Sequence, residues 1–112
     1  MQLSQGDIVW ALFPDPAGRN AKMRPAVVVT PSPEIASRLT VHVVAVTSTL
    51  TDPMPQTHVI LPWHRSKHPV SGLTKRCVAV CDWIEEIERS NVKEVGGRCP
   101  RSVLEQILDR IP

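Results

Sequence analysis

The sequence predicts a mainly β domain with a C-terminal helix, built as a small barrel or a strongly bent antiparallel sheet. Short runs rich in β-branched residues recur through the first 83 residues, and many of the eleven prolines lie between them. An apolar repeat with helical spacing appears near the end, over residues 102–111. A chain of 112 residues forms one hydrophobic core and is too short for two, so we expect a single domain, 1–112.

Five segments are expected to form the strands of this sheet. The first has Ile8, Trp10 and Leu12 in alternation with their neighbours, and Trp10 is expected in the core. The second is a short apolar run between two prolines, which is typical of a buried interior strand. Loops are expected at 14–23 and 62–73. The expected strands are residues 6–13, 25–30, 39–47, 57–61 and 75–83.

The chain changes character after residue 83. Residues 84–95 are expected to form a polar turn and a short helix, with Ser90 as N-cap and Gly96-Gly97 as its end. The sequence from Ser102 to Glu105 matches a capping box at the start of the terminal helix. The apolar positions of that helix are Val103, Leu104, Ile107, Leu108 and Ile111.

Composition and charge allow many functions and exclude few. The net charge of +2 permits an anionic partner without requiring one. No run of about 18 apolar residues occurs, and the first residues lack a signal-peptide pattern, so a cytoplasmic protein without membrane contact is expected.

The cysteines and histidines do not predict a disulfide or a metal site. If Cys77 and Cys81 share a strand, their Cα atoms are about 13 Å apart, which is too far for a disulfide. Together with Cys99 they are expected to be small buried side chains in a reducing compartment. His64 and His68 belong to a stretch that is expected to be a solvated basic loop and not a metal site.

Two basic segments are candidates for binding an anion. In AKMRPAVVVT, Lys22 and Arg24 stand where a long loop meets the buried strand, a common place for functional side chains. In LPWHRSKHP, Trp63 is flanked by Arg65 and other basic residues. This combination suits single-stranded nucleic acid, and the alternative is a plain solvated loop.

Five segments in fixed order carry a family resemblance: GDIVWALFPDPAG, RPAVVVT, VVAVTS, HVILP and GLTKRCVAVCD. Together they resemble the MazF/PemK (Kid) family. The resemblance implies an SH3-like small barrel (MazF/Kid/CcdB-like), a homodimer, and the toxin of a type II toxin–antitoxin pair. It implies a sequence-specific endoribonuclease that cuts single-stranded mRNA without metal or cofactor and is neutralised by a MazE-like antitoxin. Similar barrels of the CcdB group instead poison DNA gyrase.

Metal-free RNA cleavage by the 2′-OH gives a 2′,3′-cyclic phosphate and needs a base, a cation at the phosphorane and a proton for the leaving oxygen. By resemblance, Arg24 is the phosphate-gripping cation, Thr47 bonds the phosphate, and Asp82 is the acid–base candidate. A guanidinium suits this task because it binds two phosphate oxygens at once. The expected RNA-binding residues are Asn20, Lys22, Ser48, Trp63, Arg65, Lys75 and Trp83.

Two departures from the family pattern leave an alternative open. The first loop has Gly18-Arg19-Asn20-Ala21 in place of a common Gly-x-Glu-Gln, and Val80 replaces an arginine. The base is therefore Asp82, or it is lost. In the second case the chain is a binding module for RNA, antitoxin or gyrase. Trp83, where many members have glutamine, stacks on an RNA base or fills the seam between barrel and helix.

Overall fold

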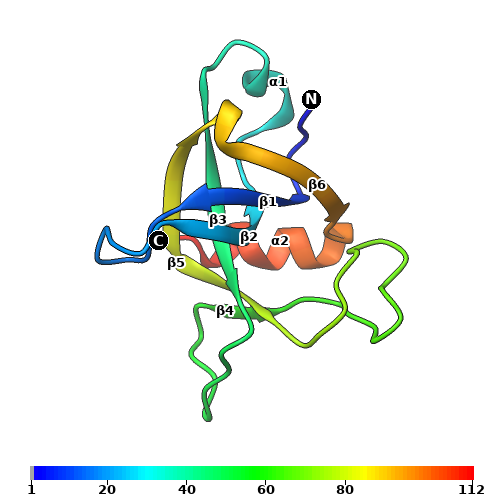
Figure 1. The fold of residues 1–112 in the computed structure, drawn as a ribbon. Helices are drawn as coiled ribbons and strands as arrows, with labels where there is room; N and C mark the ends of the chain where they lie inside the picture. The colour runs from blue at the N-terminus through cyan, green and yellow to red at the C-terminus, as the bar shows by residue number, and fades with distance from the viewer. Residues whose placement is uncertain (1) are drawn as a thin grey trace.

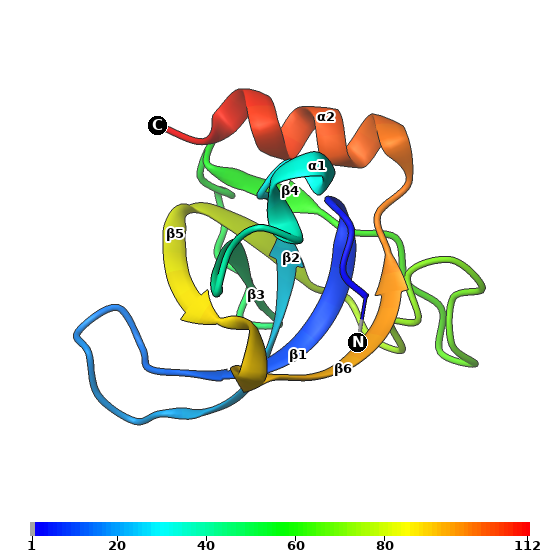
Figure 2. The ribbon, with the colours of Figure 1, turned by 90° about the horizontal axis from the view of Figure 1, so that it is seen from above.

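The computed structural model describes residues 2–112 as a bent, six-stranded antiparallel sheet with helix α2 packed across it (Figures 1 and 2). The strand order is β4-β5-β3-β2-β1-β6, so β4 and β6 form opposite edges and the barrel is not closed. The mainly β fold with a C-terminal helix is thus confirmed. The elements are β1 Asp7–Phe13, β2 Lys22–Val28, α1 Ser32–Ile35, β3 Thr40–Thr47, β4 His58–Ile60, β5 Val78–Glu88, η1 Arg89–Asn91, β6 Val92–Arg98 and α2 Arg101–Arg110.

The sheet is buried on both of its faces. Alternate residues of β1, such as Val9 and Phe13, enter one apolar cluster together with residues of β2, β3 and α1. Ile8 enters a second cluster, which α2 covers through Ile107. Two-sided burial explains why the central strands read as nearly continuous Val/Ala runs and not as a simple alternation. The free cysteines Cys77, Cys81 and Cys99 are all buried in this second cluster, as expected.

The helix expected at 84–95 is wrong. Strand β5 continues to Glu88 because it keeps its pairing with β3, and only the single turn η1 separates it from β6. Gly96 and Gly97 lie inside β6 and do not end a helix. A Cβ atom on Gly97 would lie 2.2 Å from the carbonyl oxygen of Ser71, so the glycine allows a loop to cross this strand closely.

The terminal helix is confirmed, but its expected capping box is wrong. The N-cap is Pro100, without a side-chain hydrogen bond, and its carbonyl accepts the N–H groups of Val103 and Leu104. Glu105 instead forms an exposed contact with Arg101 at 3.4 Å. The helix therefore begins at Arg101, which places Ser102 inside the first turn, and the ring of Pro100 fixes φ at the N-cap.

Candidate active site

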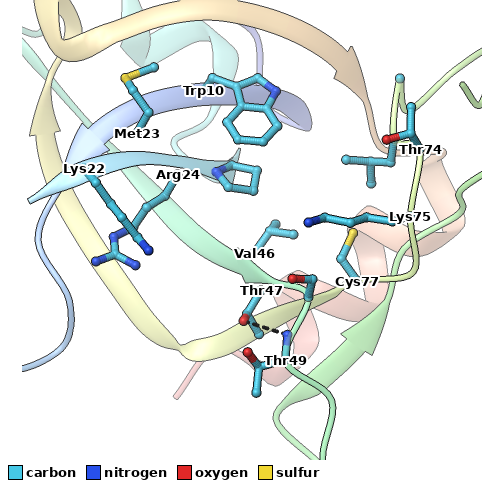
Figure 3. A pocket seen from close by; sticks show the side chains of 14 residues that line it. Trp10, Lys22, Met23, Arg24, Val46, Thr47, Thr49, Thr74, Lys75 and Cys77 are labelled. Carbon is cyan, nitrogen blue, oxygen red and sulfur yellow. Dashed lines mark hydrogen bonds between the residues drawn. The ribbon is translucent and has the colours of Figure 1, made fainter. Parts of the chain in front are cut away.

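The ends of β2 and β3 and the loop before β5 meet around a surface pocket of about 390 Å³ (Figure 3). β2 begins at Lys22 and not at the expected Pro25, which brings the basic end of the loop into the sheet. The pocket combines apolar walls with hydroxyl and cationic groups. Its lining residues are Trp10, Lys22, Met23, Arg24, Pro25, Val46, Thr47, Ser48, Thr49, Gly72, Leu73, Thr74, Lys75 and Cys77.

Arg24 is fixed by backbone acceptors and aromatic rings. Its Nε donates to the carbonyl of Phe13 at 3.1 Å, and its Nη2 donates to the carbonyl of Asn20 at 2.9 Å. The guanidinium lies over the ring of Trp83, 5.4 Å from the centroid, and Trp83 meets Phe13 edge-on. These contacts leave Nη1 without a protein partner among residues 2–112, so this nitrogen is available for a ligand.

The loop before β2 is organised around Asp15. Its carboxylate accepts the backbone N–H groups of Ala17 and Arg19 and the side-chain amide of Asn20. The bond from Arg19, followed by that from Asn20, lowers the pKa of Asp15 below its ordinary 3.8. Asn20 has φ +57°, a conformation that asparagine tolerates, and its carbonyl then meets Arg24. Asn20 thus positions the arginine through its backbone.

Thr47 ends β3 at the floor of the pocket. Its hydroxyl oxygen accepts the backbone N–H of Thr49 at 3.1 Å (Figure 3). An oxygen that already accepts keeps its own O–H free to donate, and Ser48 lies beside it. Strand pairing with Val78 fixes the backbone at this point. The threonine can therefore donate a hydrogen bond to an anion in the pocket.

The pocket is cationic. Lys22 and Arg24 reach it from β2, and Lys75 extends into it from the opposite side (Figure 3). No carboxylate and no imidazole lines this pocket in the described part of the chain. The fourth ionisable group is Cys77, buried at the floor, where burial raises the pKa of its thiol to about 11 although Lys75 opposes the shift. An anion is therefore the ligand that this site favours.

Lys75 is presented by a loop that packs closely against β6. Gly72 has φ +72°, and a Cβ atom there would lie 2.2 Å from the carbonyl oxygen of Gly96. The preceding turn is held by His68, whose Nδ1 accepts the backbone N–H groups of Val70 and Ser71. The loop 62–73 is thus an ordered turn, and the stretch after it enters the pocket in a defined place.

The structure brings half of the ten residues expected at the site together around this pocket. Arg24 and Thr47 meet there, with Lys22, Ser48 and Lys75. Asp82 instead lines a separate hollow on β5, with Val80 and Trp83. Trp63 and Arg65 are exposed on the loop 62–73 and do not line the pocket.

Two tryptophans differ from expectation. Trp10 is 37% exposed and lines the pocket, so its placement in the core was wrong. The sequence could have indicated this position, because side chains alternate along a strand and the neighbours Val9 and Ala11 both point into the core. Trp83 does not fill a seam with the helix: it packs on the first apolar cluster, whereas α2 covers the second. Its ring is a platform for Arg24.

The described residues offer neither a metal site nor a membrane-spanning helix. No group of three or more His, Cys, Asp or Glu side chains within residues 2–112 is arranged to hold a metal ion. None of the helices described in that range has the length and apolar character needed to cross a bilayer.

Comparison with known proteins places this chain in a family. The pattern of the PemK-like, MazF-like toxins of type II toxin–antitoxin systems matches residues 4–112. The chain is similar to MazF of Deinococcus radiodurans, with 25% identity, a TM-score of 0.76, and coverage of 99% of this chain and 94% of that one.

A MazE–MazF crystal structure from Deinococcus radiodurans gives 26% identity and a TM-score of 0.73, over 99% of this chain and 94% of that one. The Mycobacterium tuberculosis toxin MazF-mt6 shares the fold, with 22% identity, a TM-score of 0.73, and coverage of 94% and 91%. No curated protein sequence matches the chain. The match over nearly the whole chain shows that this protein belongs to the PemK-like, MazF-like toxin family of type II toxin–antitoxin systems.

Proposed function

We propose that this toxin is a metal-independent endoribonuclease that cuts single-stranded mRNA in the pocket around Arg24. The observation that carries the proposal is the guanidinium of Arg24, which is fixed by two backbone carbonyls and belongs to a residue that lines the same pocket as Thr47. Two preorganised donors at one anion site are what a developing phosphorane charge requires. The family membership supports the same reaction.

In the proposed reaction the 2′-oxygen of the RNA attacks the adjacent phosphorus, and the 5′-oxygen leaves. Arg24 binds a non-bridging phosphate oxygen through Nη1, and the Thr47 hydroxyl binds the other. Both bonds strengthen as negative charge grows on these oxygens in the transition state. Lys22 and Ser48 line the same pocket and bind the neighbouring backbone of the strand.

Flanking bases of the RNA reach beyond the pocket. Trp63 and Arg65 lie exposed on the ordered loop 62–73, where an aromatic face stacks on an unpaired base and a guanidinium pairs with phosphate. We further propose a cytoplasmic homodimer that is neutralised by a MazE-like antitoxin. The similarity to a MazE–MazF complex from Deinococcus radiodurans supports this partner.

The proposal is tested by incubating the purified protein with a long single-stranded RNA in EDTA. Discrete fragments are expected from the wild type and not from Arg24→Ala. Arg19→Ala is the matched control, because it removes an equal charge from the same loop while its backbone N–H to Asp15 remains. Loss of cleavage in both variants would refute a specific role for Arg24.

Asp82 stays a prediction as the acid–base residue, and the same assay ranks it. A loss of RNA cleavage in Asp82→Ala as large as that in Arg24→Ala would support that role. The absence of a carboxylate or imidazole among the described pocket residues favours the alternative, a catalytically impaired module that binds RNA, antitoxin or gyrase. Tight RNA binding by a folded wild type that cuts nothing in EDTA would support the module.

A further inference from the structure

We propose that Lys75 is the general acid of the reaction and gives its proton to the departing 5′-oxygen of the RNA. This inference rests on the proposed function, since it concerns the same pocket. Among residues 2–112, the ionisable side chains that line the pocket are Lys22, Arg24, Lys75 and Cys77.

Elimination among these groups leaves the lysines. A guanidinium does not give up its proton in a protein, so Arg24 stabilises charge and does not transfer protons. Cys77 is only 4% exposed, so its thiol presents almost no surface to a ligand in the pocket. A lysine ammonium carries its proton at neutral pH and is far more acidic than the alcohol that leaves, which suits a general acid.

Geometry selects Lys75 over Lys22. Lys22 and Arg24 stand on the same strand, β2, and on the same side of the pocket. Lys75 extends into the pocket from the other side, and no hydrogen bond or ion pair within residues 2–112 holds its amine (Figure 3). The attacking and leaving oxygens lie on opposite sides of phosphorus. If Arg24 and Thr47 bind the phosphate and the 2′-oxygen attacks from the β2 side, the leaving 5′-oxygen points to the opposite side of the pocket. Lys75 lies on that side and can donate a proton to it.

The step balances without a further reactant. The bond from the 2′-oxygen to phosphorus forms, and the bond from phosphorus to the 5′-oxygen breaks. The 2′-OH proton passes to water in the open pocket, and the Lys75 ammonium proton passes to the 5′-oxygen. The products are a 2′,3′-cyclic phosphate and a 5′-OH, and the neutral amine of Lys75 regains a proton from water.

A substrate with sulfur in place of the scissile 5′-oxygen shows whether Lys75 acts as a proton donor or only through its charge or its effect on the structure. A thiolate leaves without protonation, so it needs no general acid. The substrate is the oligoribonucleotide that the wild type cuts, with one 5′-bridging sulfur at the cut site. Lys75→Ala is expected to lower the rate of cleavage of the ordinary substrate by about 100-fold or more, and that of the sulfur substrate by less than about five-fold.

Lys75→Arg distinguishes proton donation from charge. Because arginine keeps the charge but does not release a proton, it is expected to resemble Lys75→Ala with both substrates. Lys93→Ala removes an exposed lysine charge outside the pocket and is expected to cut both substrates normally. Wild-type rates in Lys75→Arg, or equal slowing of both substrates in Lys75→Ala, would overturn the inference. A wild type that cuts neither substrate would instead refute the proposed function.

Discussion

Replacing Arg24 with lysine keeps the charge of the site but removes the geometry of the guanidinium. In the structure Nε and Nη2 bind the carbonyls of Phe13 and Asn20, and Nη1 remains for the phosphate. A lysine has a single nitrogen, which cannot serve the loop and the phosphate together. One hydrogen bond to a charged group is worth about 1.5–3 kcal/mol, so kcat/KM should fall about 10- to 150-fold.

The assay is a kcat/KM measurement with a short quenched fluorescent RNA at fixed ionic strength, because phosphate binding depends on salt. The fall is expected mainly in kcat, since the phosphate contact strengthens in the transition state. Thermal unfolding of the Arg24→Lys variant checks that the fold persists. A variant with kcat/KM within about three-fold of wild type would instead show that a positive charge alone suffices at this position.

Three further predictions concern the fold and its titrating groups. The NMR chemical shift of the Arg19 amide proton, which donates to Asp15, should change with pH with a midpoint below 3.8, because the pKa of Asp15 is lowered in the folded chain. The carboxylate then stabilises the loop at pH values above 3.8, and this stabilisation is lost as the carboxylate is protonated. A midpoint at or above 3.8 would contradict this. Ile107→Ala should cost about 2–5 kcal/mol in the free energy of unfolding, measured in urea, whereas Leu108→Ala, at a position 37% exposed, should cost clearly less. The Cys77 thiol should react with a disulfide reagent at pH 8 about 100-fold more slowly in the folded chain than in guanidinium, as its pKa rises from 9.0 to about 11; equal rates would contradict this.

The sequence predicted the structure best where the local preference of a segment for a strand agrees with its pairing in the sheet. The run after Arg24 is apolar and β-branched, and it forms β2 in the centre of the sheet. Lys22 and Arg24 were expected to be functional because loops at strand ends carry sites, and Thr47 was expected from the family resemblance. All three line one pocket.

Strand β6 could not be predicted from its own residues. Its Gly-Gly pair resembles the end of a helix, and only the crossing loop at Ser71 explains why glycine is needed at 97. Pairing with β1, more than 80 positions away in sequence, makes the segment a strand. Such long-range pairing outweighs the weak local preference of a polar segment.

The neighbouring residues in the sequence also could not predict which way the side chain of Asp82 faces. The register between β3 and β5 shifts between Val44 and Val46, so β5 carries extra residues in the region of Asp82 and Trp83. An irregularity of this kind alters which side chains face each way. Trp83 thereby meets Arg24, while Asp82 lines the neighbouring hollow. Nothing in the spacing of VCDW marks the shift.

The most direct test of the central claim uses the 2′-OH itself. A single-stranded RNA that the protein cuts in EDTA is compared with the same RNA carrying one 2′-deoxynucleotide on the 5′ side of the cut, and the ends are identified by mass spectrometry. The account predicts 2′,3′-cyclic phosphate and 5′-OH ends at that position, and no cutting there once the hydroxyl is removed. Continued cutting at the deoxy position, or ends bearing a 5′-phosphate, would contradict it.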